Sequence, residues 1–204
     1  MIVVGIVGGI ASGKSVVSRE FERLGAVSIN ADKIGHEVLE QPDIIEALTN
    51  RWGSNVIANG SLNRAAIAEI VFADTEQGQT ELAFLESISH PRISQEVSDR
   101  LQAFRDQGVP MVILDAALLL KAGWDEMCDT IVYVEVDRKT RLMRAQSERG
   151  WTEQQYDQRE QSQIPLSLKR SKANILIDNS GELGQTRTQV REVWERLIDN
   201  KPTK

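Results

Sequence analysis

Hydrophobic residues along the chain follow two alternating spacings. The runs Ile2–Val7 and Met111–Leu114 are apolar and short, as expected of strands that are buried on both faces of a sheet. Residues 17–24 place apolar side chains at helical spacing until Gly25 ends the pattern, and residues 26–29 form another short apolar run. A strand, a helix and a strand in this order predict a βαβ unit, and therefore an α/β fold with a parallel sheet.

The same spacings continue to the end of the chain. They predict helices over residues 31–39, 43–52, 62–72, 80–105 and 182–199, and strands over residues 111–114, 130–136 and 175–177. His90-Pro91 interrupts the longest helical pattern, and proline there is expected to end one helix or to open another at its first turn. His90 would then lie at a junction, where its side chain could face a cleft.

A phosphate-binding motif follows the first predicted strand. Gly8-Gly9-Ile10-Ala11-Ser12-Gly13-Lys14-Ser15 fits the spacing G-x-x-x-x-G-K-[ST]. Backbone N–H groups and the positive end of a helix converge on one anion in such a loop, so Gly9 to Val16 are expected to bind nucleotide phosphates. Lys14 would reach the β- and γ-phosphates, and the Ser15 hydroxyl would hold Mg²⁺.

Two aspartates follow predicted strands on the rim where ligands bind in parallel sheets. Asp115 ends an apolar run and suits Mg²⁺ or its water ligands. Asp32 is a candidate base for an attacking hydroxyl, and the alternative is an N-cap on the helix that follows. His36 lies one helical turn beyond Asp32, so it either touches the same substrate or is a plain surface histidine.

Composition restricts the partners of the chain. Its 204 residues carry a net charge of −6, which disfavours nucleic acid and anionic membranes as partners of the whole surface. The length suits one domain with excursions.

The single cysteine, Cys128, fits a reducing compartment and is expected to be a small, partly buried residue rather than a catalytic thiol. No basic leader precedes the first strand and no apolar run approaches a membrane span, so we expect a cytoplasmic protein.

Arginines are concentrated in one predicted helix near residues 138–149. They include Arg138, Arg141, Arg144 and Arg149. Guanidinium groups pair bidentately with phosphate oxygens, so this cluster suggests a lid that closes over phosphates. The alternative is a solvated helix face with charge pairs. Thr152-Glu153-Gln154-Gln155 is a capping box that would open the next helix.

The order of these motifs resembles dephospho-CoA kinase, the last enzyme of coenzyme A synthesis. Besides the phosphate loop, the similar segments are Ala31-Asp32, Leu62-Asn63-Arg64, Leu85-Glu86-x-Ile88-x-His90-Pro91, Asp115 with Leu118-Leu119, and Ile177-Asp178-Asn179; single matches include Arg144, Gln163 and Lys169. The resemblance extends over nearly the whole chain.

The resemblance implies ATP-dependent phosphorylation of the ribose 3′-hydroxyl of dephospho-CoA, with ATP and Mg²⁺. It also implies a three-layer fold with a parallel five-stranded sheet flanked by helices. The nucleotide-binding core would comprise residues 1–32, 108–137 and 173–200, with a helical CoA-binding excursion at 33–107 and a lid at 138–172.

The resemblance also suggests a role for individual residues. Asp32 corresponds to the proposed base, Arg144 to a lid arginine of the catalytic set, and Asn179 to a position near the adenine. Arg64, His90 and Leu118 fall on the dephospho-CoA side, where we also place His36.

Three departures from the family pattern keep other functions open. Asn30, Ala117 and Lys121 stand where the family usually has Asp, Pro and Glu. Another small-molecule kinase, acting on a nucleoside monophosphate, is one alternative, and a nucleotide-binding regulator without catalysis is another. We expect a monomer, at most a weak oligomer, that binds small molecules and neither nucleic acid nor membranes.

Overall fold

The structure is a computed structural model that describes residues 1–58 and 60–199. Residue 200, which ends the core segment expected at 173–200, lies outside the described residues. Contacts divide the chain into two compact units: residues 1–30 together with those from 101 onward, and residues 31–100. Each unit is described by itself below.

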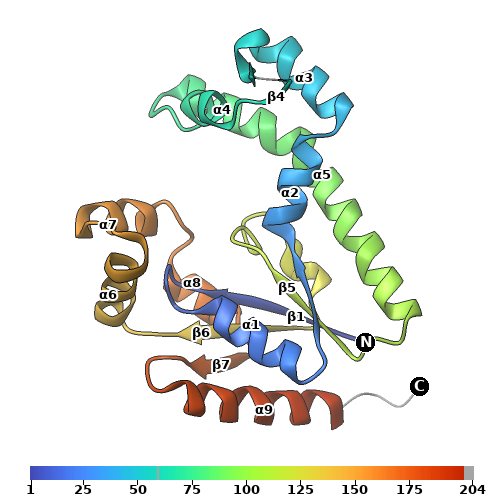
Figure 1. Cartoon of the computed structure of the whole chain (residues 1–204), viewed down its shortest axis with the longest axis vertical. Helices are drawn as coiled ribbons and strands as arrows, with labels where there is room; N and C mark the ends of the chain where they lie inside the picture. Colours follow the sequence, from blue (N-terminus) through green and yellow to red (C-terminus); the bar gives the residue numbers. More distant parts are fainter. Residues whose placement is uncertain (59, 200–204) are drawn as a thin grey trace. The chain divides into compact units, whose positions relative to one another are not determined.

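The first unit is built around a parallel sheet (Figure 1). Its elements are β1 (Ile2–Gly8), α1 (Lys14–Arg23), β2 (Val27–Asn30), β5 (Met111–Asp115), η2 (Trp124–Met127), β6 (Thr130–Glu135), α6 (Arg138–Arg149), α7 (Glu153–Gln161), α8 (Leu166–Lys172), β7 (Ile175–Asp178) and α9 (Leu183–Asp199). The sheet has five strands in the order β2-β5-β1-β6-β7, and all neighbours are parallel. This confirms the predicted five-stranded α/β fold.

The register aligns the carboxyl ends of the strands at one edge of the sheet. Asp115 pairs with Ile6 of β1 on one side and with Asn30 of β2 on the other. Gly8, where the phosphate loop begins, pairs with Val134 of β6. The loop and Asp115 therefore leave the sheet along the same rim, as the sequence predicts.

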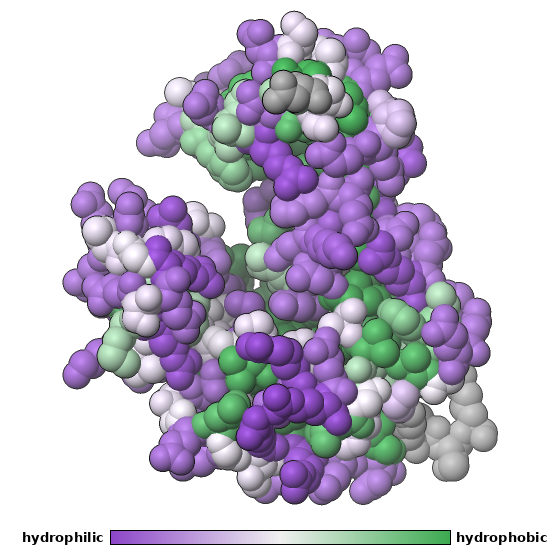
Figure 2. Space-filling view, in the orientation of Figure 1, coloured by the Kyte–Doolittle hydropathy of each residue, from purple (hydrophilic) through white to green (hydrophobic). Residues whose placement is uncertain are grey.

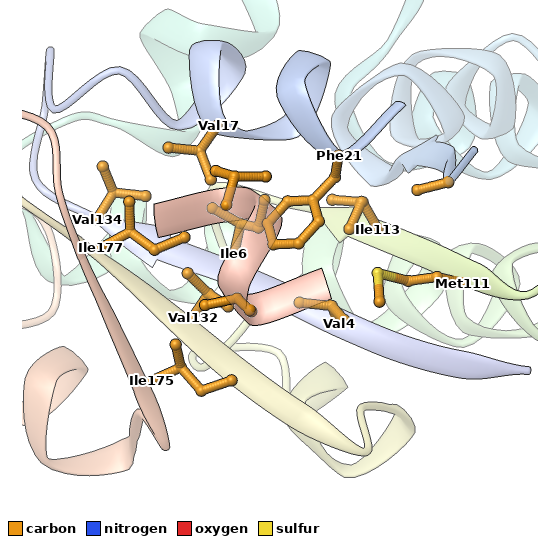
Figure 3. Close-up of a cluster of buried hydrophobic side chains, with 13 residues drawn as sticks. Val4, Ile6, Val17, Phe21, Met111, Ile113, Val132, Val134, Ile175 and Ile177 are labelled. Atoms are coloured by element: carbon orange, nitrogen blue, oxygen red, sulfur yellow. The ribbon is translucent and has the colours of Figure 1, made fainter. Parts of the chain in front are cut away.

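Helices α1 and α9 cover one face of the sheet. Figure 3 shows Val17 and Phe21 of α1 converging with strand side chains such as Ile6 and Val132, and these four residues are fully buried. Successive side chains along a strand face opposite sides of the sheet, so Gly5, which lies between Val4 and Ile6 of this cluster, faces away from it. A Cβ on Gly5 would lie 2.9 Å from both Leu119 and Cys128, which shows how closely the segment after β5 packs on that face.

Strand β7 is an edge strand of the sheet. The side chain of Gln189 on α9 accepts a hydrogen bond from the backbone N–H of Asp178, at 2.9 Å. Its amide nitrogen donates to the carbonyl oxygen of the same residue, at 2.8 Å. One side chain thus pairs with both backbone groups of Asp178.

The second unit is mainly helical. It contains α2 (Ala31–Leu39), α3 (Pro42–Trp52), η1 (Ser54–Val56), β3 (Ile57–Ala58), β4 (Ser61–Leu62), α4 (Arg64–Val71) and most of α5 (Glu76–Asp106). The helix predicted over 62–72 begins later, at Arg64, because Leu62 pairs with Ile57 in a short hairpin. Asn63 caps α4 through its side chain, which accepts from the backbone N–H of Ala66 at 3.2 Å.

Helix α5 is continuous through Pro91. The prediction that Pro91 ends or opens a helix is therefore wrong. A proline inside a helix costs about 3 kcal/mol, but Ile93 and Val97 beyond it are buried, and so is Glu81 before it. Packing on both sides of the proline outweighs the lost hydrogen bond.

A buried carboxylate joins α3 to α5. Glu81 accepts hydrogen bonds from Arg51 at 2.9 and 3.0 Å and from the indole N–H of Trp52 at 2.8 Å. These bonds, those from Arg51 above all, lower the pKa of Glu81.

Polar side chains dominate the face of the molecule drawn in Figure 2, and apolar groups occupy small separate areas. In the part of the chain that the structure describes, no helix is both long and apolar enough to cross a bilayer.

Candidate functional site

The loop between β1 and α1 has the backbone geometry of an anion cradle. Gly13, the N-cap residue of α1, has a φ of 84°, and Ala11 has a φ of 57°. Positive φ is uncommon for alanine and costs roughly 1–2 kcal/mol, and strain of this kind concentrates at functional sites. Helix α1 begins directly after Gly13, and the N-terminus of a helix favours an anion through its backbone N–H groups and its positive dipole end.

Two glycines of the loop have close side-chain neighbours. A Cβ on Gly13 would lie 2.2 Å from Nδ2 of Asn179, and one on Gly9 would lie 2.6 Å from Nη1 of Arg141. These neighbours come from β7's carboxyl end and from α6. Side chains from distant parts of the chain therefore contact the loop and restrict its backbone.

Asn179 braces the loop. Its side-chain amide donates to the carbonyl oxygen of Ser12 at 2.8 Å, and its Oδ1 accepts from the Thr186 hydroxyl at 2.9 Å. Asn179 is 5% exposed and Thr186 is fully buried. Arg144 donates to the carbonyl oxygen of Asn179 at 2.8 Å, which brings this predicted lid arginine beside the loop. The Ser12 hydroxyl is buried without a hydrogen-bond partner among the described residues, so it is available to a ligand.

Arg141 is buried under the loop instead of facing solvent. Its Nε donates to the carbonyl oxygen of Val136 at 3.1 Å, and its Nη1 donates to the Tyr156 hydroxyl and to the Glu160 carboxylate. Burial, followed by the hydrogen bond to Glu160, raises the pKa of Tyr156 to about 12. This network ties α6 and α7 together, and it leaves the Arg141 guanidinium in contact with Gly9.

Other arginines of the cluster make local contacts. Arg138 pairs with Glu153 at 3.0 Å and also with Asp157. The guanidinium carbon of Arg149 lies 4.8 Å from the centre of the Trp151 ring. These contacts agree with the alternative of a helix face with charge pairs, and Arg144 is the member of the cluster nearest the loop's Gly13. The capping box predicted at 152–155 is confirmed, with both of its hydrogen bonds formed.

Lys169 and Gln163 also belong to the site, although the sequence analysis assigns them no role beyond single matches to the family. The Lys169 ammonium donates to the carbonyl oxygen of Gly8 at 3.2 Å and to Oε1 of Gln163 at 2.7 Å. Lys169 is 6% exposed. Burial, and then the charge of Lys14, lower the pKa of Lys169 to about 8.

A cavity of about 90 Å³ opens beside the loop within the first unit. Its walls are Val7, Gly8, Lys14, residues 116–121, residues 162–164 and Lys169. Leu118, expected on the acceptor side, is one of these lining residues and is 38% exposed. The altered segment with Ala117 and Lys121 also lines this cavity.

The remaining acceptor-side candidates belong to the second unit. Asp32 is the second residue of α2, so it lies inside the helix and is not its N-cap. Asp32 and His36 are exposed, four residues apart on one face of α2. Arg64 begins α4 and pairs with Glu40 at 3.4 Å, while His90 lies within the continuous α5 and not at a helix junction.

The comparisons with known proteins agree over the full length of the chain. A sequence model of the dephospho-CoA kinase family matches residues 2–185. A dephospho-CoA kinase from Geobacter sulfurreducens is 35% identical over 198 residues, which cover 96% of this chain and 98% of the relative. Another, from Thermobifida fusca, is 37% identical over 199 residues, with 97% and 96% covered. This chain belongs to the dephospho-CoA kinase family.

Solved structures share the fold of this dephospho-CoA kinase family member. A Thermus thermophilus protein matches with a TM-score of 0.82 and 25% identity, covering 98% of both chains. The dephospho-CoA kinase from Campylobacter jejuni matches with a TM-score of 0.73 at 21% identity, again covering 98% of both. A shikimate kinase from Acinetobacter baumannii matches with a TM-score of 0.54 at 16% identity over 100% of this chain and 96% of its own. The fold is therefore that of phosphate-loop kinases.

Cys128 has the structural character predicted for it in this family member. It is partly exposed, and its thiol lies against the face of β1 at Gly5. Burial, followed by the charges of Asp125 and Asp129, raises the pKa of Cys128 to about 12. A thiol with that pKa is a poor nucleophile at neutral pH.

Proposed function

We propose that this protein transfers the γ-phosphoryl group of ATP to the ribose 3′-hydroxyl of dephospho-CoA, giving coenzyme A and ADP. The observation that carries the proposal is the match to the dephospho-CoA kinase family over residues 2–185, which includes the phosphate loop. The left-handed backbone at Ala11 and Gly13 and the contacts from Asn179 and Arg141 support ATP as the ligand of that loop.

In the proposed reaction, the 3′-hydroxyl oxygen forms a bond to the γ-phosphorus while the bond from this phosphorus to the β–γ bridging oxygen breaks. The hydroxyl proton passes to the carboxylate of Asp32, and ADP leaves with the bridging oxygen. Support for Asp32 comes from chain position: it follows Asn30, the last residue of β2, by two residues. Lys14 neutralises charge on the transferred group, and we propose that Arg144 also contacts this group; the hydrogen bond from Arg144 to the carbonyl oxygen of Asn179, beside the loop, supports this role.

Mg²⁺ fits the donor set of the loop. No group of three or more His, Cys, Asp or Glu side chains is gathered to hold a metal among the described residues. Mg²⁺ is typically bound by one or two protein oxygens together with substrate phosphates, so Ser15 and Asp115 are a sufficient protein contribution. When bound, the ion would neutralise phosphate charge and orient the β- and γ-phosphates.

The residues that we propose to contact the acceptor come from several elements. We assign Leu118 and the segment around it to the acceptor, because they line the cavity beside Lys14. His36, Arg64 and His90 are proposed to contact dephospho-CoA on the strength of the family resemblance. We further propose a cytoplasmic monomer.

The direct test is a coupled assay with purified protein, ATP, Mg²⁺ and dephospho-CoA. We expect equal amounts of coenzyme A and ADP, identified by chromatography and mass, and loss of both in Lys14→Met. A panel of nucleoside monophosphates serves as the competing acceptors. Absence of coenzyme A, or a strong preference for a nucleoside monophosphate, would contradict the proposal.

A further inference from the structure

Lys169 is a buried cation within the wall of the nucleotide loop. It lies on α8, is 6% exposed, and reaches the carbonyl oxygen of Gly8 at 3.2 Å. Gly8 is 161 residues away in the chain and is the residue at which the loop leaves β1. The ammonium therefore contacts the root of the loop from the side of α8.

An ammonium group is costly to bury unless all of its donors are used. Lys169 has three N–H donors, and the described residues accept two of them, through Gly8 and Gln163. Desolvation of a charged group that remains partly unsatisfied is unfavourable. An anionic ligand for the third donor would offset this cost.

The cavity beside the loop supplies the place for such a ligand. Lys169 lines it together with Lys14, Gly8 and Gln163. Lys14 is the residue that reaches the β- and γ-phosphates in loops of this pattern. A ligand group in the cavity that contacts the ammonium groups of both Lys14 and Lys169 would therefore belong to the terminal-phosphate end of the nucleotide.

We propose that Lys169 is a further catalytic cation beside Lys14 and Arg144, which donates its third N–H to an oxygen of the γ-phosphoryl group while Gly8 and Gln163 fix its position. This role depends on the proposed binding of ATP to the phosphate loop, and it does not depend on which acceptor the enzyme uses. It gives the α8 lysine a direct role in stabilising the charge of the transferred group.

The protonation of Lys169 is consistent with this role. The charged groups that act on it are Lys14 on the loop side, Arg141 on α6 and Glu160 on α7. Burial and the two cations lower its pKa to about 8, while Glu160 opposes them. A phosphate dianion in contact would raise the pKa again, so binding of a triphosphate near pH 8 should be accompanied by proton uptake.

The test compares two nucleotides that differ at the γ-phosphate. Affinities for ADP and for an ATP analogue with an imido β–γ bridge are measured by calorimetry with Mg²⁺, for the parent protein and for Lys169→Met. We expect the variant to lose about tenfold to 100-fold in affinity for the analogue, the scale of a hydrogen bond to a charged group. Its affinity for ADP should change by less than about threefold. Lys172→Met, on the exposed end of the same helix, is the matched control and should bind both nucleotides normally.

Several outcomes would overturn the inference. Equal losses for the analogue and for ADP would mean that Lys169 only supports the loop, and unchanged affinities would mean that it has no role. If Lys169→Met does not fold, proton uptake by the parent protein, measured in two buffers of different ionisation enthalpy at pH 8, decides the question. Uptake with the analogue but not with ADP supports the inference, and equal uptake contradicts it. A parent protein that binds neither nucleotide would instead refute the proposed function itself.

Discussion

The side-chain amide of Asn179 donates a hydrogen bond to the carbonyl oxygen of Ser12, 2.8 Å away, across 167 residues of sequence. The residue that follows the last strand thus holds the middle of the phosphate loop. The family resemblance places Asn179 near the adenine of ATP. In the structure its side chain is occupied by Ser12 and Thr186, and its backbone oxygen by Arg144.

Asn179→Asp should weaken both the loop and nucleotide binding. The substitution keeps the shape of the side chain but replaces the donor toward Ser12 with a carboxylate oxygen that repels the carbonyl. A buried acceptor without its partner costs about 1–3 kcal/mol, and we expect a free energy of unfolding lower by that amount and a higher KM for ATP. Denaturant unfolding and steady-state kinetics provide the measurements. Ser180→Ala, at the next residue, is the control, and identical values for both variants would remove Asn179 from this role.

Asp32→Asn should separate binding from chemistry. An amide cannot accept the proton of the attacking hydroxyl, so kcat should fall by about 100-fold or more, while the dissociation constant for ATP stays within about twofold. Asp74→Asn changes another exposed aspartate and should leave kcat unaltered. Full activity of Asp32→Asn would exclude Asp32 as the base.

The Cys128 thiol should resist alkylation in the folded protein. Its pKa is raised from 9.0 to about 12, so its thiolate fraction at pH 8 is about 1000-fold lower than that of an ordinary cysteine. Labelling with iodoacetamide, followed by mass spectrometry, should be slower by at least about 100-fold than in the urea-unfolded chain, even before burial is considered. Equal labelling rates would show that the thiol is neither buried nor perturbed.

Acid should destabilise the second unit through Glu81. The hydrogen bonds from Arg51 and Trp52 lower the pKa of Glu81 from 4.5, so its contribution to stability is complete above pH 4.5 and is lost as the pH falls through the lower, folded-state pKa. The parent protein should lose stability over this acidic range more steeply than Glu81→Gln. The variant should also be the less stable protein at pH 7. Urea unfolding at a series of pH values tests both statements, and parallel pH profiles would contradict them.

Local patterns explain which parts of the fold could be predicted from the sequence. The helix at 31–39 has the predicted bounds because its buried residues Ile34 and Val38 repeat with helical spacing. The strands β3 and β4 were missed because two-residue strands are too short to show a period. Pro91 misled the prediction because sequence shows the local cost of a proline but not the packing that outweighs it.

The site was predictable only where one motif contains all of its parts. Residues 8–15 carry their own spacing, whereas Lys169 is one lysine in a short polar helix with Arg170 and Lys172, which resembles a solvated face. Arg141 and Arg138 likewise stand three residues apart in one basic run, yet one is 3% exposed and the other contacts surface acids. Which basic residue turns inward depends on partners that are distant in sequence, so no periodicity reveals it.

The pairing of Gln189 with Asp178 has a consequence for solubility. An edge strand normally offers unpaired N–H and carbonyl groups on which a strand from another molecule can grow. On β7 the α9 glutamine already occupies both groups of Asp178, at 2.9 and 2.8 Å. A foreign strand would have to displace a pre-formed amide pair before it could extend the sheet at this residue. Helix α9 therefore also hinders the addition of a strand from another molecule to β7, the edge strand of the sheet.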